Sequence, residues 1–259
     1  MALPKIMVAP NGAHLGKADH PALPVTIAEI VACAAACWHA GAGGIHAHVR
    51  DADGQHVLDV GLYRELLAEL ALVVPEMAVQ ITTEAVGRYS PLQQRHLVET
   101  VRPAMVSVAL REIIAEPDEA CTTRFFSFCA EASIAVQHIL YTAAEVDALA
   151  GLIARGVVAK SNLQILHVLG RYSAGQVSGP ADLDRPLARQ TAVHLSADWA
   201  VCAFGQAETP CLLQALRAGG KVRVGFENNI LHLDGTIARD NADRVRSVIQ
   251  SAQAEGLPL

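Results

Sequence analysis

Eight short apolar segments, each followed by sequence typical of a helix, constrain the fold more than any other feature of this chain. This strict alternation, with no linker or break in composition, is typical of parallel strands connected by helices. Eight such units in 259 residues favour a single (β/α)8 TIM barrel, one domain spanning 1–259, over a doubly wound sheet. The predicted strands cover residues 6–9, 43–50, 77–83, 105–110, 134–140, 163–169, 199–204 and 221–226.

The predicted helices begin at recognisable capping residues. Thr26 and Glu29 have the spacing of a capping box, and so do Ser90 and Gln93, with a proline directly after Ser90. The stretch 170–186 is rich in glycine and proline, so we expect a long functional loop followed by a short helix. The other predicted helices cover residues 59–73, 117–132, 143–154, 208–218 and 239–254.

Composition and charge exclude several functional classes. Hydrophobic residues make up 52% of the chain, enough for a large core. No uninterrupted apolar stretch reaches the ~18 residues of a membrane span, and residues 1–5 lack the pattern of a signal peptide. The net charge of -6, without a basic stripe, argues against nucleic acid as a partner. The sequence therefore predicts a soluble, cytoplasmic protein.

The six cysteines give little sign of a metal site. Cys33 and Cys37 would share one face of a helix and could form half of a zinc site, but no second pair has a matching spacing. We interpret the cysteines as buried thiols in a reducing compartment.

Two histidines one residue apart, His46 and His48, stand near the end of the second predicted strand. Side chains alternate between the two faces of a strand, so both imidazoles would point to the same side. In a barrel, the carboxyl ends of the strands are where active sites form. For the pair in isolation, a structural role for one histidine is as good an interpretation as metal binding.

A carboxylate that follows the last strand favours the metal. Closure of a barrel would place the eighth strand about 10 Å from the second, with the first strand between them. Glu227, just past the eighth strand, could then reach a metal held by His46 and His48. Two imidazoles and a carboxylate with open coordination positions are typical of a catalytic site for Zn²⁺ or another divalent metal.

Further polar residues follow the predicted strands, where a packed core would exclude them. Their convergence on one rim predicts a substrate-binding site. Arg88, Arg111 and Arg171 lie on rim loops and could bind a carboxylate or a phosphate. The other candidates are Asn11, His14, Thr82, Thr83, Glu84 and Ser107.

Several motifs together resemble those of the β-keto acid cleavage enzymes, and they span nearly the whole chain. They cover residues 11–13, 20–26, 46–51, 168–170, 199–201 and 219–229. The resemblance implies a (β/α)8 barrel, usually a homotetramer, with zinc held by His46, His48 and Glu227. It also implies that a β-keto acid condenses with acetyl-CoA to give acetoacetate and a new acyl-CoA.

The resemblance assigns catalytic roles to four residues. Arg223 matches an arginine thought to assist proton abstraction, and Thr82 and Ser107 match hydroxyl groups near the reacting acyl group. Asn228 stands where the family usually has an acidic partner of that arginine. The identity of the general base is therefore open.

Two other departures from the family concern the substrate. His14 stands where the amino-substrate enzymes have a carboxylate, and residues 136–139 lack the usual acidic pair. A buried ammonium group without a counter-charge is costly. With Arg88 and Arg111 on the rim, we expect a neutral or dicarboxylic β-keto acid.

Three alternatives stay open on the sequence alone. A retro-aldol lyase would use the same metal but no acetyl-CoA. An amidohydrolase-like hydrolase also uses a His-x-His pair on a barrel, although on the first strand and with further His and Asp ligands. The third alternative is a barrel that binds the metal but has lost activity, since Asn228 replaces the usual acidic residue.

Overall fold

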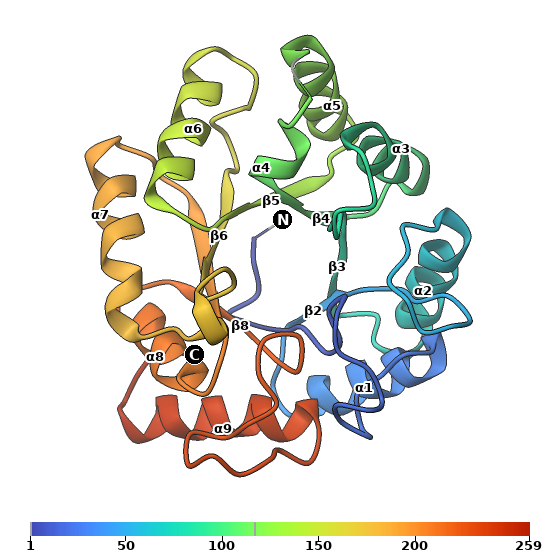
Figure 1. The fold of residues 1–259 in the computed structure, drawn as a ribbon, viewed down its shortest axis with the longest axis vertical. Helices are drawn as coiled ribbons and strands as arrows, with labels where there is room; N and C mark the ends of the chain where they lie inside the picture. The colour runs from blue at the N-terminus through green and yellow to red at the C-terminus, as the bar shows by residue number, and fades with distance from the viewer. Residues whose placement is uncertain (1, 117) are drawn as a thin grey trace.

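The computed structural model describes residues 2–116 and 118–259, and its strands form a closed parallel barrel. Each strand pairs with the next one, and β8 closes the ring on β1. Figure 1 looks along the barrel, with the strands as an inner ring and the helices around them. The predicted (β/α)8 barrel is confirmed. From β1 to β8 the strands are Ile6–Val8, Gly44–Ala47, Ala78–Thr82, Met105–Ala109, Ala135–Leu140, Gln164–Leu169, Asp198–Ala203 and Lys221–Val224.

The helices start largely where the capping residues predict. Thr26 and Ser90 cap α1 and α3, and both capping boxes are present. No helix within the described ranges is long and apolar enough to cross a membrane. From α1 to α9 the helices are Ile27–His39, Val60–Val73, Pro91–Val101, Leu110–Ile113, Glu119–Glu131, Ala143–Ala154, Asp184–Ala192, Glu208–Arg217 and Asn241–Ala254.

Some boundaries differ from the sequence prediction. The helix start predicted at Pro117 lies outside the described residues, and Asp118 caps α5. The short helix α4 was not predicted, because its first residue continues the apolar run of β4. The loop predicted to end at Pro186 contains two 3-10 turns and the start of α7, because proline fits the first turn of a helix, where no intrahelical N–H bond is lost.

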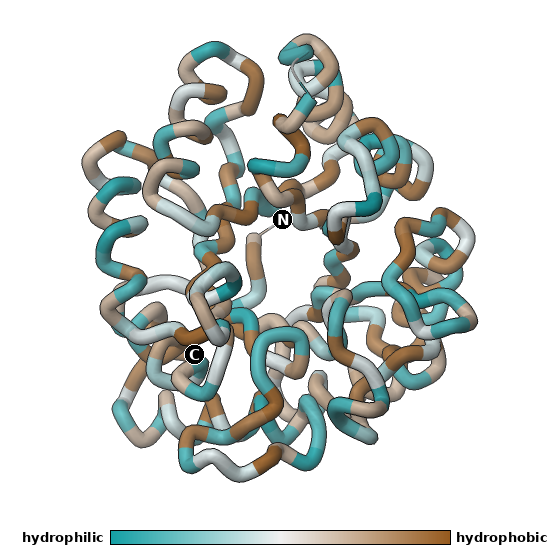
Figure 2. The backbone as a smooth tube through the Cα atoms, in the orientation of Figure 1, coloured by the Kyte–Doolittle hydropathy of each residue, from teal (hydrophilic) through white to brown (hydrophobic). Residues whose placement is uncertain are grey.

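Two hydrophobic layers hold the barrel together. Inward-pointing side chains such as Met105, Ile139 and Leu166 fill the lumen, and a larger layer lies between strands and helices. Figure 2 shows hydrophobic residues along the ring of strands and hydrophilic ones recurring along the outer helices and loops. Leu3 joins the lumen layer at the amino ends of the strands, where its backbone amide donates to Asp198 Oδ2 at 2.8 Å. This packing leaves the carboxyl ends of the strands for a site.

Candidate metal centre and active site

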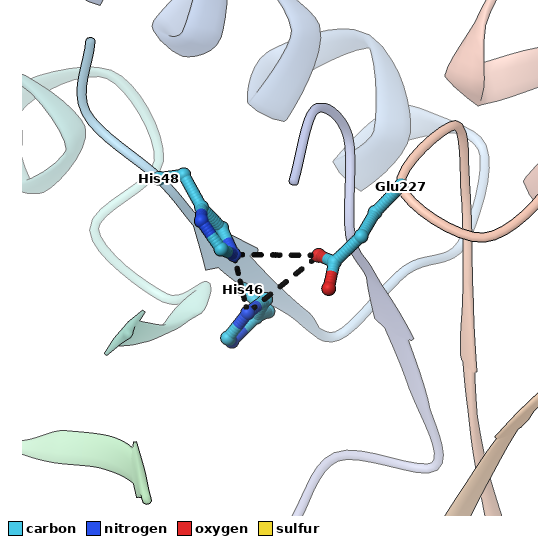
Figure 3. A group of neighbouring side chains, drawn as sticks. All are labelled: His46, His48 and Glu227. Carbon is cyan, nitrogen blue, oxygen red and sulfur yellow. Dashed lines mark hydrogen bonds and ion pairs between the residues drawn. The ribbon is translucent and has the colours of Figure 1, made fainter. Parts of the chain in front are cut away.

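His46, His48 and Glu227 converge at the carboxyl end of the barrel. His46 lies in β2, His48 directly after it, and Glu227 after β8, while β1 separates the two strands. The two imidazole Nε2 atoms are 3.1 Å apart, and Glu227 Oε2 lies 3.6 Å from each. Figure 3 shows all three side chains pointing toward one another. The convergence expected from barrel closure is therefore present in the fold.

Two glycines allow Glu227 to reach this position. Gly225 has a φ of +146°, and a Cβ there would lie 2.3 Å from the Ala9 carbonyl oxygen. That close approach lets the Glu227 amide donate to the same oxygen at 3.1 Å, which turns the chain toward β1. A Cβ at Gly12 would lie only 2.5 Å from Glu227 Cγ. Both positions therefore need glycine if the carboxylate is to face the histidines.

Hydrogen bonds fix which nitrogen of His46 faces the pocket. His46 Nδ1 donates to Gln80 Oε1 at 2.8 Å, since a carbonyl oxygen only accepts. Gln80 in turn donates through Nε2 to Gln137 Oε1 at 3.1 Å, inside the barrel. The lone pair of His46 is therefore on Nε2, the atom nearest Glu227.

A second chain of hydrogen bonds does the same for His48. His56 Nε2 donates to the Glu84 carbonyl oxygen at 3.0 Å, so its Nδ1 is the acceptor. His48 Nδ1 lies 3.4 Å from that atom and donates to it. The Nε2 lone pair of His48 consequently faces Glu227 as well. Asn11 holds the backbone of His48, with its Nδ2 donating to the His48 carbonyl at 2.8 Å.

The electrostatics of the three groups suit a bound cation. Burial, with the positive charge of Arg223, lowers the pKa of His46 well below its usual value, and burial also lowers that of His48. Both rings are therefore neutral, as metal ligation requires. Burial raises the pKa of Glu227, whose Oε2 has no hydrogen-bond donor among the described residues.

These donors fit a divalent metal. The ligand atoms of the three residues all lie within 4.8 Å of one another, and no other such His, Cys or carboxylate cluster occurs in 2–116 and 118–259. Two imidazole nitrogens and one carboxylate oxygen are ligands that zinc and similar ions bind, with positions left for substrate. An unsatisfied buried oxygen opposite two imidazole lone pairs is the arrangement that a cation would satisfy.

The pocket next to the triad of His46, His48 and Glu227 also contains the positive charge of Arg223 and the hydroxyl of Thr82. Arg223, 3% exposed, donates from Nη2 to Glu227 Oε1 at 3.1 Å and to Cys202 Sγ at 3.5 Å. Thr82 Oγ1 accepts from the Glu84 amide at 3.0 Å, which leaves its hydroxyl hydrogen free to donate. The pocket is lined by His46, His48, Thr82, Glu84, Ala109, Ile139, Tyr141, Val168, Arg171, Phe204, Arg223 and Glu227.

The family model for β-keto acid cleavage enzymes matches residues 5–259. The chain belongs to this family. A 3-keto-5-aminohexanoate cleavage enzyme of Acetoanaerobium sticklandii is 25% identical over 261 aligned positions, covering 98% of this chain and 93% of that one. A 3-oxoadipate:acetyl-CoA acetyltransferase of Cupriavidus necator is 25% identical over 271 positions, covering 98% and 90%.

Among solved structures, the fold is similar to that of ObcA in its apo form. The TM-score is 0.73 at 16% identity, and the match covers 92% of this chain but 63% of that one. This chain thus spans under two thirds of ObcA, and the likeness shows the fold alone.

The residues that differ from the β-keto acid cleavage enzyme pattern lie at different distances from the pocket. His14 is exposed at the pocket mouth, 3.6 Å from Glu84 Oε1, and also contacts Arg171. Asn228 is directed at the start of helix α8, where its Nδ2 donates to Glu208 Oε1 at 3.3 Å. His138 points out of the barrel onto Phe126, away from the pocket. Of these residues, only His14 lies at the pocket.

The other site residues named from the sequence are divided between the pocket and its surroundings. Ser107 pairs in register with Thr82, and Thr83 Oγ1 donates to the Ser107 carbonyl at 3.0 Å. Arg88 is exposed beside the Tyr89 ring, and Arg111 is held by Glu145 at 2.7 Å. Neither arginine lines the metal pocket, whereas Arg171 does.

Three further residues at the site, Gln80, His56 and Tyr141, were not predicted from the sequence. Gln80 is a buried polar residue within an otherwise apolar strand, and it pairs in register with His46. A buried glutamine in such a strand indicates a polar partner inside the barrel, but only the strand register identifies that partner as His46. His56 follows a turn in which Asp51 accepts from the amides of Asp53 and Gln55. The turn brings His56 back beside Arg50, which no single motif predicts.

Proposed function

We propose that this protein condenses a β-keto acid with acetyl-CoA and releases acetoacetate and a new acyl-CoA. The metal, zinc in the first instance, would be held by His46, His48 and Glu227. The observation that carries the proposal is the pair of imidazole lone pairs facing a buried, unsatisfied carboxylate oxygen in a family barrel. The family resemblance also supports a homotetramer, which sedimentation would test.

The reaction needs negative charge to be stabilised on the keto acid. A divalent ion bound at the triad supplies Lewis-acid polarisation of a β-keto acid and lowers the energy of its enolate. Arg223 adds a buried positive charge beside Glu227, close to where that charge develops. Thr82 can donate its free hydroxyl hydrogen into the same pocket, and the Ser107 hydroxyl has no partner in the described chain. We assign both hydroxyls to the oxygen of the reacting acyl group.

The substrate we propose is a neutral or dicarboxylic β-keto acid. Arg171 lines the pocket, and His14 contacts it at the mouth, so a distal carboxylate would meet the Arg171 guanidinium beside the His14 imidazole. Arg88 and Arg111 do not line this pocket, so Arg171 is the arginine that we assign to the substrate carboxylate. The Cupriavidus necator relative carries the name of a dicarboxylic keto acid, which supports the same class.

A substrate panel tests the proposed function. Zinc-loaded protein is incubated with acetyl-CoA and, separately, 3-oxoadipate, a neutral 3-oxo acid and 3-keto-5-aminohexanoate, and CoA esters are measured by mass spectrometry. We expect acetyl-CoA-dependent products from 3-oxoadipate or the neutral acid. Cleavage without acetyl-CoA would favour the lyase instead. Rates with the amino substrate above all others would contradict the proposed specificity.

Two variants of His14 refine the specificity test. A carboxylate at this position would repel a substrate carboxylate near Arg171, whereas a small side chain would only remove a contact. We expect His14→Glu to raise the KM for 3-oxoadipate, and His14→Ala to raise it less. Equal KM effects of both variants would show that His14 does not take part in recognising the substrate carboxylate.

A further inference from the structure

Enolate formation requires a group that accepts a proton from the carbon between the keto and carboxylate groups. Asn228 cannot be that group, because a carboxamide is not basic and its Nδ2 is engaged by Glu208 Oε1 and the Arg223 carbonyl oxygen, at 3.3 and 3.2 Å. Glu208 itself is fully buried and pairs with Arg244 behind the strands. The base must therefore come from another wall of the pocket.

Of the carboxylates in the described ranges, Glu84 and Glu227 line the pocket. Glu227 points at the two imidazole lone pairs and is assigned to the metal. We propose that Glu84 is the general base that removes the proton from the β-keto acid. This inference rests on the proposed function and names the residue that takes the acidic role missing at Asn228.

The position of Glu84 fits a proton acceptor. It lies two residues past the end of β3, and its carboxylate oxygens are 3.8 Å from His48 Nδ1 and 3.7 Å from Arg171 Nη2. Its side chain is 21% exposed, so a substrate in the pocket can contact it while most of the solvent is excluded. The Arg171 guanidinium places positive charge beside the carboxylate, on the side of the mouth, which favours its ionised, proton-accepting form. A keto acid held at the triad would lie between the metal ligands and this carboxylate.

Glu84 alone can both accept and return the proton that the reaction transfers. Glu84 takes the proton as the C–H bond breaks, and the electron pair stays on the keto acid as its enolate. The enolate attacks acetyl-CoA and expels CoA thiolate, which then attacks the original keto carbon. The bond between that carbon and the former enolate carbon breaks, which gives acyl-CoA and the enolate of acetoacetate. Protonated Glu84 returns its proton to that enolate, so no other donor is required.

Hydrogen exchange separates this step from the whole reaction. Zinc-loaded protein is mixed with 3-oxoadipate in D2O without acetyl-CoA, and loss of the C2 proton signal is followed by NMR above the uncatalysed rate. We expect Glu84→Gln to slow the enzyme-catalysed exchange and the acyl transfer together, by about 100-fold or more. Zinc content and the Kd for 3-oxoadipate should stay near the wild-type values. Glu84→Asp keeps the carboxylate and should recover part of the rate.

Glu112→Gln is the matched control. The Glu112 carboxylate lies behind the same loop, where Oε2 accepts from the Ala85 amide and Gln94 Nε2, and it does not line the pocket. Its variant should exchange as the wild type does. Exchange by Glu84→Gln at the wild-type rate, or loss of zinc from this variant, would overturn the base role. Wild-type protein that neither exchanges nor transfers would instead refute the proposed function.

Discussion

Gln80 accepts a hydrogen bond of 2.8 Å from His46 Nδ1, across two strands that pair in register at these residues. The bond determines that the other imidazole nitrogen carries the lone pair directed at Glu227. A residue of β3 thus orients the β2 histidine that we propose as a metal ligand. Such outer partners commonly matter almost as much as the ligands themselves.

Gln80→Leu should weaken metal binding without removing a ligand. The leucine leaves His46 free to change tautomer or rotate, so we expect the zinc Kd to rise about 10- to 100-fold. Competition with a chelating dye measures it. Gln190→Leu is a control, because Gln190 makes an equivalent contact of 3.0 Å with His167, away from the metal pocket. Equal zinc affinity in both variants would show that Gln80 does not orient His46.

Gly12→Ala should displace the Glu227 ligand. The added Cβ would lie 2.5 Å from Glu227 Cγ, and the φ of +55° at this position also disfavours alanine. We expect weaker zinc binding and a lower Tm. Gly16→Ala lies in the same loop with no atom within 4 Å of the added Cβ, so it should keep both properties. A Gly12→Ala protein that binds zinc as Gly16→Ala does would contradict this role.

His138 should make the protein less stable in acid. Burial lowers its pKa from 6.5 to about 4, so below pH 6.5 the unfolded chain binds a proton that the folded chain excludes. Stability is therefore full above pH 6.5 and falls toward pH 4, by about 3 kcal/mol from this group. His138→Leu should flatten the pH dependence of the free energy of unfolding, measured with urea, by that amount. An unchanged pH dependence would mean that the imidazole titrates normally in the folded protein.

The fold and the convergence of His46, His48 and Glu227 can be predicted from patterns within one sequence. Alternating strands and helices predict the barrel, and barrel closure explains why Glu227 meets two histidines of another strand. Gln80 and His56 could not be assigned because their partners depend on strand register and on the path of a loop. Arg171 was one of three rim arginines, and only side-chain packing distinguishes it from the others.

Zinc titration of metal-free protein tests whether His46, His48 and Glu227 bind a catalytic metal. Bound zinc per chain and acyl-CoA formation from 3-oxoadipate and acetyl-CoA are measured at each step of the titration. We expect one ion per chain, activity that rises in proportion to occupancy, and loss of both when His46 and His48 are replaced with alanine. Full activity in the metal-free protein, or unchanged zinc binding without the two histidines, would contradict it.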